Sequence, residues 1–221
     1  MTIEMNLSGF LFLFILVLNL VMGALGYLME KDDYDSDADL QKINKSPRRF
    51  QLGIVLALIE HGSVIALTIV LFIAFSPYNL VFGIVWTAFR TGEGLIQFYN
   101  EPNYWRLIHI ARQYSSASGA EKSSLSDLGR SIFKAKDTRF KFAMICWSIG
   151  TLAYSIVLVA YEVVPPIIGW LGVVSSILVG LSTGIKLAKL NAKDFTSIGG
   201  LSAILFEVII GGWLLFSPLI Y

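Results

Sequence analysis

The stretch Leu7–Leu28, LSGFLFLFILVLNLVMGALGYL, contains no charged side chain over 22 residues. At about 1.5 Å of rise per residue, a helix of this length reaches across the roughly 30 Å hydrocarbon core of a bilayer. No Lys or Arg precedes it, so it lacks the basic start of a secretory signal peptide. We therefore expect it to be retained as a membrane anchor.

Five further apolar runs of similar length follow along the chain. They predict an all-α fold, a polytopic membrane helical bundle that forms one domain over residues 1–221. The six predicted transmembrane helices lie at about residues 7–28, 50–75, 79–99, 138–161, 167–188 and 198–219. The composition agrees, because only 15% of the residues are charged, against about a quarter in soluble domains. Pro77 and Pro165–Pro166 mark breaks between successive spans.

Two long polar segments separate these spans. Residues 30–49 are first acidic and then basic, and we expect a solvated loop. The alternative is a calcium site in the acidic half, but the spacing of an EF-hand is missing. In residues 100–136, apolar side chains at helical spacing from Tyr104 to Tyr114 predict a short cytoplasmic interfacial helix. Residues 115–124 are expected to be a mobile linker, and Ser126 to cap a second short helix over residues 127–136.

The basic residues are strongly segregated along the chain. Every Lys and Arg except Arg90 lies in the first, third or fifth connecting segment or at its edges. The positive-inside rule then predicts a multi-pass protein of the cell membrane. Residues 29–49, 100–137 and 189–197 would face the cytoplasm, and both termini would lie outside.

Four ionisable residues fall inside predicted spans: Glu60, Arg90, Glu93 and Glu207. Glu60, Arg90 and Glu207 each lie roughly 14 Å from the cytoplasmic ends of their spans, and Glu93 is one turn nearer that side. Charges in lipid are costly, so these groups are expected to face inward and pair, with Arg90 offering its planar fork to two carboxylates. One arginine against three carboxyls leaves excess negative charge. At least one carboxyl is therefore expected to be protonated at neutral pH, unless a cation or partner enters.

Polar side chains on the same helices could support this cluster, namely His61, Ser63, Thr87 and Gln97. His61 follows Glu60 but points about 100° away around the helix, so we expect a hydrogen-bonded interior residue rather than a ligand. Three interpretations of the cluster remain open. It can be a buried ion-pair network that fixes helix register, a proton, cation or substrate site, or a contact with a partner subunit.

Small residues recur at four-residue spacing in the fifth span: Gly172, Ser176, Gly180 and Gly184. Such a face allows close helix contact, which we expect within the monomer, with a homodimer as the alternative. Cys146 is the one cysteine and the two histidines lie far apart in sequence, so we expect no metal and no cofactor. The chain also carries no recognisable catalytic or nucleic-acid-binding motif.

Three stretches carry a family resemblance. They are FGIVWTAFRTGEGLI at Phe82–Ile96, the segment from Ala135 to Ile177 with its Pro-then-Gly restart, and LFEVIIGGWLLF at Leu205–Phe216. On these motifs, and over about residues 50–218, the chain resembles the bacterial and archaeal membrane proteins of the domain of unknown function 4386 family. The resemblance implies six spans and an intramembrane Arg/Glu set, and it implies no reaction.

Three functions are compatible with these features. The small size and the absence of a catalytic motif favour a non-catalytic accessory or scaffold component of a membrane complex. The unbalanced acids at a common depth suggest a small proton- or cation-coupled transporter. An enzyme that acts on lipid, with Glu93 or Glu60 as general base, has the least support, because no nucleophile or metal set accompanies them.

Overall fold

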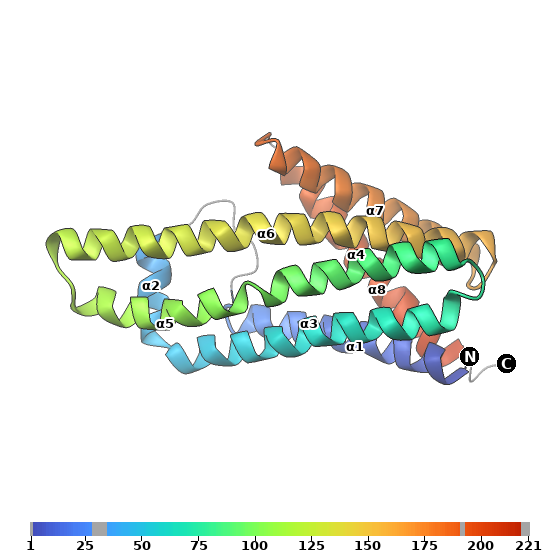
Figure 1. Ribbon diagram of the computed structural model, residues 1–221, viewed down its shortest axis with the longest axis horizontal. Helices are drawn as coiled ribbons and strands as arrows, with labels where there is room; N and C mark the ends of the chain where they lie inside the picture. Colours follow the sequence, from blue (N-terminus) through green and yellow to red (C-terminus); the bar gives the residue numbers. More distant parts are fainter. Residues whose placement is uncertain (1, 28–34, 191–192, 218–221) are drawn as a thin grey trace.

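The computed structural model describes residues 2–27, 35–190 and 193–217, and these residues form eight helices and no strand (Figure 1). The helices are α1 (Thr2–Ala24), α2 (Ser36–Lys45), α3 (Pro47–Phe75), α4 (Leu80–Phe98), α5 (Glu101–Ser116), α6 (Gly119–Ala160), α7 (Pro166–Leu187) and α8 (Lys193–Phe216). The prediction of an all-helical membrane bundle is confirmed. The predicted limits Leu28 and Leu219 lie outside the described residues, as do residues 191 and 192.

Five helices (α1, α3, α6, α7 and α8) are long and apolar enough to cross a membrane. The third predicted span is α4, whose 19 residues reach roughly 28 Å. Its composition is less apolar because Arg90 and Glu93 lie within it. It nevertheless packs between α3 and α6 as part of the bundle.

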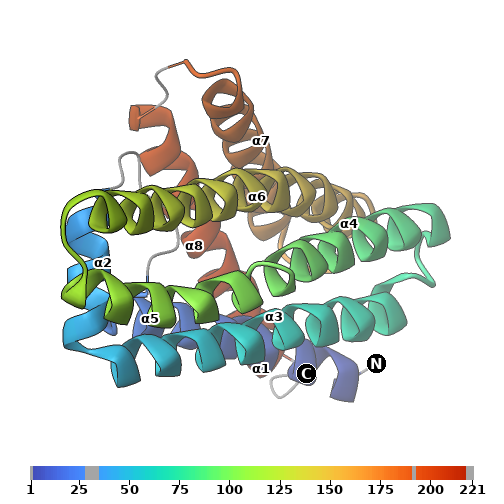
Figure 2. The same ribbon diagram turned by 60° about the vertical axis from the view of Figure 1, so that its left-hand side comes forward.

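The six long helices form a closed ring. In contact order the ring runs α1, α3, α4, α6, α7, α8 and back to α1. Both ends of the described chain lie at one end of the bundle, which we call the terminal end (Figure 1). Figure 2 shows that the end of α7 and the start of α8 lie apart from α6.

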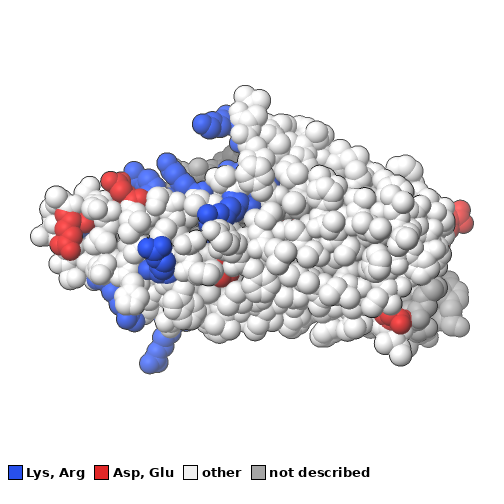
Figure 3. Space-filling model, viewed as in Figure 1, with Lys and Arg blue, Asp and Glu red and all other residues white. Residues whose placement is uncertain are grey.

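The other end, here called the charged end, consists of α2, α5 and residues 119–137 of α6. These segments project beyond the end of α7 (Figure 1). Lys and Arg side chains gather over this half of the visible surface (Figure 3). The charge segregation seen along the sequence is therefore also a segregation in space.

Two predictions for the polar segments are wrong. Residues 36–45 form α2 rather than a loop, because Asp35 accepts a hydrogen bond from the Ala38 amide at 3.1 Å and Leu40 is buried. The proposed short helix 127–136 and most of the expected linker belong to the continuous α6, where Phe133 is buried against Tyr104. Residues 30–34 of the acidic segment considered for calcium lie outside the described residues.

Local sequence sets several helix limits. Asn79 starts α4 by accepting a hydrogen bond from the Phe82 amide at 3.1 Å. Pro166 occupies the first turn of α7, where no backbone donor is needed. Pro102 does the same for α5, and it follows directly on the turn that ends α4. This turn places Glu101 at the junction of α4 and α5.

Two apolar clusters fill the interior. One lies in the half nearer the terminal end and includes Phe75, Trp86 and Tyr154, whose rings meet edge to face at 5.4 to 5.6 Å. The other lies toward the charged end and includes Tyr104 and Phe133. A layer of polar side chains separates them, and this layer holds the candidate site.

Candidate functional site

A cavity of about 410 Å³ lies inside the ring of helices. All six long helices contribute to its wall, and the wall is mostly apolar. Glu60, Arg90, Glu93 and Glu207 all line it. The structure thus brings together around one space the four charges that the sequence places at similar depths.

Arg90 and Glu93 form the ion pair of this cavity. Arg90 Nη1 donates to Glu93 Oε2 at 2.7 Å, one helical turn away on α4. Arg90 is 9% exposed and Glu93 3%, so the pair is shielded from solvent and its attraction is strong. On its other side the guanidinium lies 5.9 Å from the centre of the Trp147 ring, which favours a cation.

Glu207 is held differently. Trp147 Nε1 donates to Glu207 Oε1 at 3.2 Å. No Lys, Arg or His within the described part of the chain lies at ion-pair distance from this carboxylate. Glu207 is partly exposed, and it lines the cavity. A neutral hydrogen-bond donor is therefore its direct partner, and the cavity is its open side.

Glu60 is the third carboxylate of the cavity. Its Oε2 lies 2.5 Å from Nδ1 of His61, the next residue on α3. Both residues are at most 4% exposed. His61 is the hydrogen-bonded interior residue that the sequence predicts.

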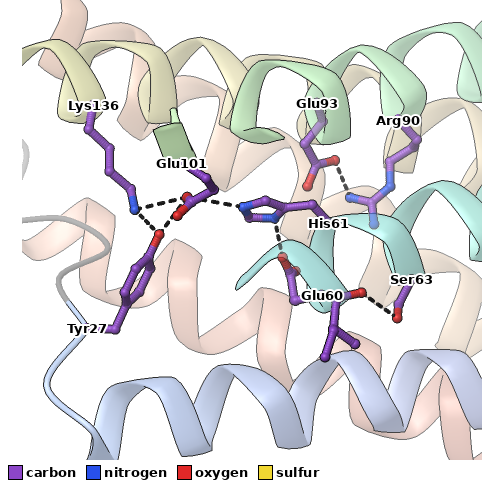
Figure 4. Close-up of polar contacts among 9 residues, drawn as sticks. Tyr27, Glu60, His61, Ser63, Arg90, Glu93, Glu101 and Lys136 are labelled. Atoms are coloured by element: carbon purple, nitrogen blue, oxygen red, sulfur yellow. Dashed lines mark hydrogen bonds and ion pairs between the residues drawn. The ribbon is translucent and has the colours of Figure 1, made fainter. Parts of the chain in front are cut away.

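A second group of buried polar side chains continues from His61 toward the charged end (Figure 4). His61 Nε2 lies 3.5 Å from Glu101 Oε1. The same oxygen accepts a hydrogen bond from Tyr27 Oη at 2.6 Å and lies 3.3 Å from Lys136 Nζ. Lys136 also donates to Tyr27 Oη. We call these five residues (Tyr27, Glu60, His61, Glu101 and Lys136) the polar chain.

The members outside the spans have shifted pKa values. Burial favours the neutral form of Lys136 and lowers its pKa to about 8, although Glu101 opposes the shift. Burial alone would raise the pKa of Glu101, but the His61 ring 3.5 Å away and the Lys136 charge outweigh it and lower the pKa. Burial and the nearby Glu101 carboxylate raise the pKa of Tyr27, so this hydroxyl stays a donor.

The remaining predicted site residues are placed as follows. Arg90 contacts one carboxylate, Glu93, rather than the two expected, because Glu60 and Glu207 each have a different partner. Gln97 lines the cavity. Ser63 donates to the Ile59 carbonyl of its own helix at 2.8 Å. The Thr87 hydroxyl is buried and has no hydrogen-bond partner among the described residues.

Sequence reasoning missed Tyr27, Glu101, Lys136 and Trp147 as site residues. The first three lie at or beyond the ends of predicted spans, where a charged or polar residue is unremarkable. The spacing of Gln97 and Glu101, one turn apart across the break before Pro102, is the signal that could have linked Glu101 to the cluster. Trp147 looks like any aromatic residue of an apolar span.

The small-residue face of α7 packs inside the chain over most of its length. A Cβ on Gly172 would lie 2.6 Å from the Phe206 ring, and a Cβ on Gly180 would lie 2.4 Å from Ser148 Oγ. The Ser176 carbonyl accepts a hydrogen bond from Ser148 at 2.7 Å. Gly184, at the charged end of the same face, has open space within 4 Å.

Across residues 2–27, 35–190 and 193–217, no group of three His, Cys, Asp or Glu side chains has the geometry to hold a metal ion.

Comparison with known proteins gives one match. No curated protein and no solved structure matches the chain. A family model matches residues 7–217, which is nearly the whole chain. The protein belongs to the family described as "Domain of unknown function (DUF4386)".

Proposed function

We propose that this protein is a proton-coupled membrane carrier for a small organic cation with an apolar body. The observation that carries the proposal is the cavity of about 410 Å³ whose mostly apolar wall holds three carboxylates, one arginine and two lysines. Of the two lysines, Lys141 is paired with Asp137 at 2.7 Å. This volume lies within the range of small-molecule sites, which combine an apolar wall with a few polar groups. Around Arg90, away from the lysines, three carboxylates face one arginine, which favours a cation over an anion at this depth.

Glu207 is the residue that would bind the cation. Arg90 balances Glu93, and His61 can balance Glu60 when its ring is protonated. Glu207 has only the neutral Trp147 indole as its direct partner. A proton or a cationic ligand can fill this position, and competition between the two couples ligand binding to proton release.

The cavity is closed toward the terminal end by Phe12, Trp86 and Phe206, which leave only a small void of about 20 Å³. Lys141 and Lys186 line it on the side of the charged end. We place the charged end in the cytoplasm and both termini outside, because basic residues remain on the cytoplasmic side. The structure would then represent the carrier with its cavity directed toward the cytoplasm.

The proposal is tested with purified protein and benzyltriethylammonium as the probe cation. Isothermal titration calorimetry in two buffers of different ionisation enthalpy reports both the affinity and the protons released. We expect Glu207→Gln to weaken binding at least about tenfold, the equivalent of 1.4 kcal/mol, and to abolish proton release. Glu121→Gln, an exposed residue of α6, is the matched control.

Two outcomes would refute the carrier. One is a wild-type protein that binds neither this cation nor smaller and larger tetraalkylammonium ions. The other is equal binding by wild type and Glu207→Gln. Benzenesulfonate, an aromatic anion of comparable size, should not bind. Uptake of the cation into proteoliposomes, driven by an imposed pH gradient, then separates transport from binding alone.

An accessory role is the second candidate, and the lobe formed by α2, α5 and the start of α6 favours it. This lobe, which is the charged end defined above, projects beyond the end of α7 (Figure 1) and would offer a partner a docking surface. Purification from native membranes followed by mass spectrometry tests it. A stoichiometric partner that is lost when the lobe is mutated would support the accessory role. The lipid-acting enzyme gains no support, since Ser63 is bound to its own helix.

A further inference from the structure

Two cavities lie on opposite sides of the polar chain. The large cavity is lined by Glu60. A separate pocket of about 160 Å³ at the charged end lies between α5 and α6 and is lined by Lys136. The buried residues Glu101 and His61 connect Lys136 to Glu60 (Figure 4).

We propose that Lys136, Glu101 and His61 form a proton relay that carries protons from the pocket at the charged end to Glu60 in the large cavity. This inference rests on the proposed function, since the relay would bring protons into the cavity in which the cation binds. It assigns roles to Glu101 and Lys136, which lie outside the cavity and do not bind the ligand.

The distances along the relay suit proton transfer. The steps are 3.3 Å from Lys136 Nζ to Glu101 Oε1, 3.5 Å from that oxygen to His61 Nε2, and 2.5 Å from His61 Nδ1 to Glu60 Oε2. The first and last steps are hydrogen bonds, whereas the middle step is longer, and a small rotation of the imidazole would shorten it. His61 Nε2 and Glu101 Oε2 are both buried without a hydrogen-bond partner among the described residues. A transferable proton has an acceptor at each of these positions.

Each proton is accounted for along this route. The Lys136 ammonium gives a proton to Glu101, which passes it to His61 Nε2, while the proton on Nδ1 moves to Glu60. Lys136, now a neutral amine, takes a proton from water in the pocket. The net result is one proton lost from that water and one gained by Glu60. The imidazole turns over to restore its first tautomer.

The groups around the relay favour proton transfer along this route. Lys136 has a pKa of about 8, so it exchanges protons close to neutral pH. Tyr27 packs against both Lys136 and Glu101 and stays protonated, because its pKa is raised. Arg90 and Glu93 on α4 line the cavity beside Glu60, and their ion pair leaves Glu60 as the acceptor next to His61. Phe98 covers the His61 ring at 5.6 Å.

The experiment follows the arrival of a proton at Glu60 by time-resolved infrared spectroscopy. Protons are released by flash photolysis of a caged acid in membranes that contain the purified protein. The carboxyl band of Glu60 is assigned by its loss in Glu60→Gln. General acid–base groups in proteins typically contribute rate factors of about 10² to 10⁴. We therefore expect His61→Gln and Glu101→Gln to slow the rise of this band at least about tenfold while its final amplitude is kept.

His109→Gln and Glu121→Gln, both exposed residues near the charged end, are the matched controls and should protonate Glu60 at the wild-type rate. The thermal unfolding midpoint of each variant verifies folding. If Glu101→Gln does not fold, His61→Gln alone decides, because it interrupts a different step. Added formic acid, a small mobile proton donor, should restore the rate in either variant.

Equal rates in wild type and in a folded His61→Gln or Glu101→Gln protein would overturn the relay. This result is distinct from failure of the carrier, because the infrared signal needs neither ligand nor transport. A slowed Glu60 signal without any cation binding in wild type would refute the carrier alone. A wild-type rate of the Glu60 band in the folded His61→Gln or Glu101→Gln protein, together with intact cation binding by wild type, would refute the relay alone.

Discussion

The contact between α1 and α8 near the terminal end depends on glycine, whereas two glycines of α7 and α8 toward the charged end lie in open space. Near the terminal end, α1 and α8 touch. A Cβ on Gly9 would lie 2.3 Å from the Leu215 backbone nitrogen, and one on Gly211 would lie 2.9 Å from Phe12 Cβ. Toward the charged end, a Cβ on Gly184 or Gly200 would meet no atom of another element within 4 Å. The terminal half is closed by direct helix contact, whereas toward the charged end the six long helices leave room for the large cavity.

Arg90 stands at the boundary between these halves. It lines both the large cavity and the small void among Phe12, Trp86 and Phe206. Its stem lies so close to α6 that a Cβ on Gly150 would approach Arg90 Cγ to 2.7 Å. Its guanidinium points to Glu93 in the cavity. The stem of Arg90 is thus tightly packed against α6, as helices are in the terminal half, while its charged group faces the large cavity.

The largest effect should come from breaking the ion pair at this boundary. Arg90→Gln leaves Glu93, which is 3% exposed, without its cation. Removal of one partner of a buried pair costs about 3 to 5 kcal/mol. We expect a loss of that size in the free energy of unfolding, measured by denaturation in mixed micelles. The double variant Arg90→Gln/Glu93→Gln should recover part of the loss, and no recovery would count against the pair as the cause.

Overpacking of the closed half should have the next largest effect. Gly9→Val places a branched side chain against the backbone of α8, and overpacking costs about 1 to 3 kcal/mol. Gly23→Val on the same helix is the control, because a Cβ on Gly23 would meet no atom of another element within 4 Å. The unfolding free energies of both variants, measured in the same micelles, should differ by at least about 1 kcal/mol. Equal values would mean that the contact between α1 and α8 is not tight.

The sequence predicted the fold well because the bilayer constrains it strongly. Apolar runs near twenty residues long and the prolines at 77 and 165–166 were enough to locate six helices that form the ring. The depth of Glu60, Arg90 and Glu207 followed from helical rise alone. Helix rise along a membrane normal is a one-dimensional measure, so a single sequence can supply it.

Sequence could not predict which groups become partners. Glu60 meets its neighbour His61 rather than Arg90, and Glu207 meets Trp147, because helix rotation and side-chain rotamers decide these contacts. The helical lobe was also missed. The first half of α6 is polar by composition, and it is stabilised by burial of Phe133 against α5, a contact that exists only in three dimensions.

Acid should destabilise the part of the molecule around Glu101 at the charged end and leave the terminal half unchanged. The pKa of Glu101 is lowered from its ordinary value of 4.5, so the folded state binds fewer protons than the unfolded state. The stabilisation that the ionised Glu101 carboxylate gives to the folded state is fully present above pH 4.5 and is lost as the pH falls through the lowered pKa. Hydrogen exchange, corrected for its intrinsic pH dependence, should show lost protection in α2 and α5 below about pH 4.5, with α1 near Gly9 unchanged.

Glu101→Gln is the control for this acid effect, since it cannot titrate. Its protection should be lower than that of wild type at neutral pH and should change less on acidification. Uniform loss of protection along the whole chain in wild type would show that acid acts through many carboxylates. In that case the polar chain would not be the acid-sensitive part of the molecule.

The smallest effect should be a gain in stability, and it tests the comparison most directly. Gly200 on α8 has room for a methyl group, whereas Gly211 on the same helix does not. Alanine in place of an interior helical glycine gains up to about 1 kcal/mol from backbone entropy. Gly200→Ala should therefore raise the thermal unfolding midpoint, and Gly211→Ala should lower it, because the Phe12 side chain would have to move. Two shifts of the same sign would mean that helix propensity, rather than the difference in packing between the two halves, governs the stability of α8.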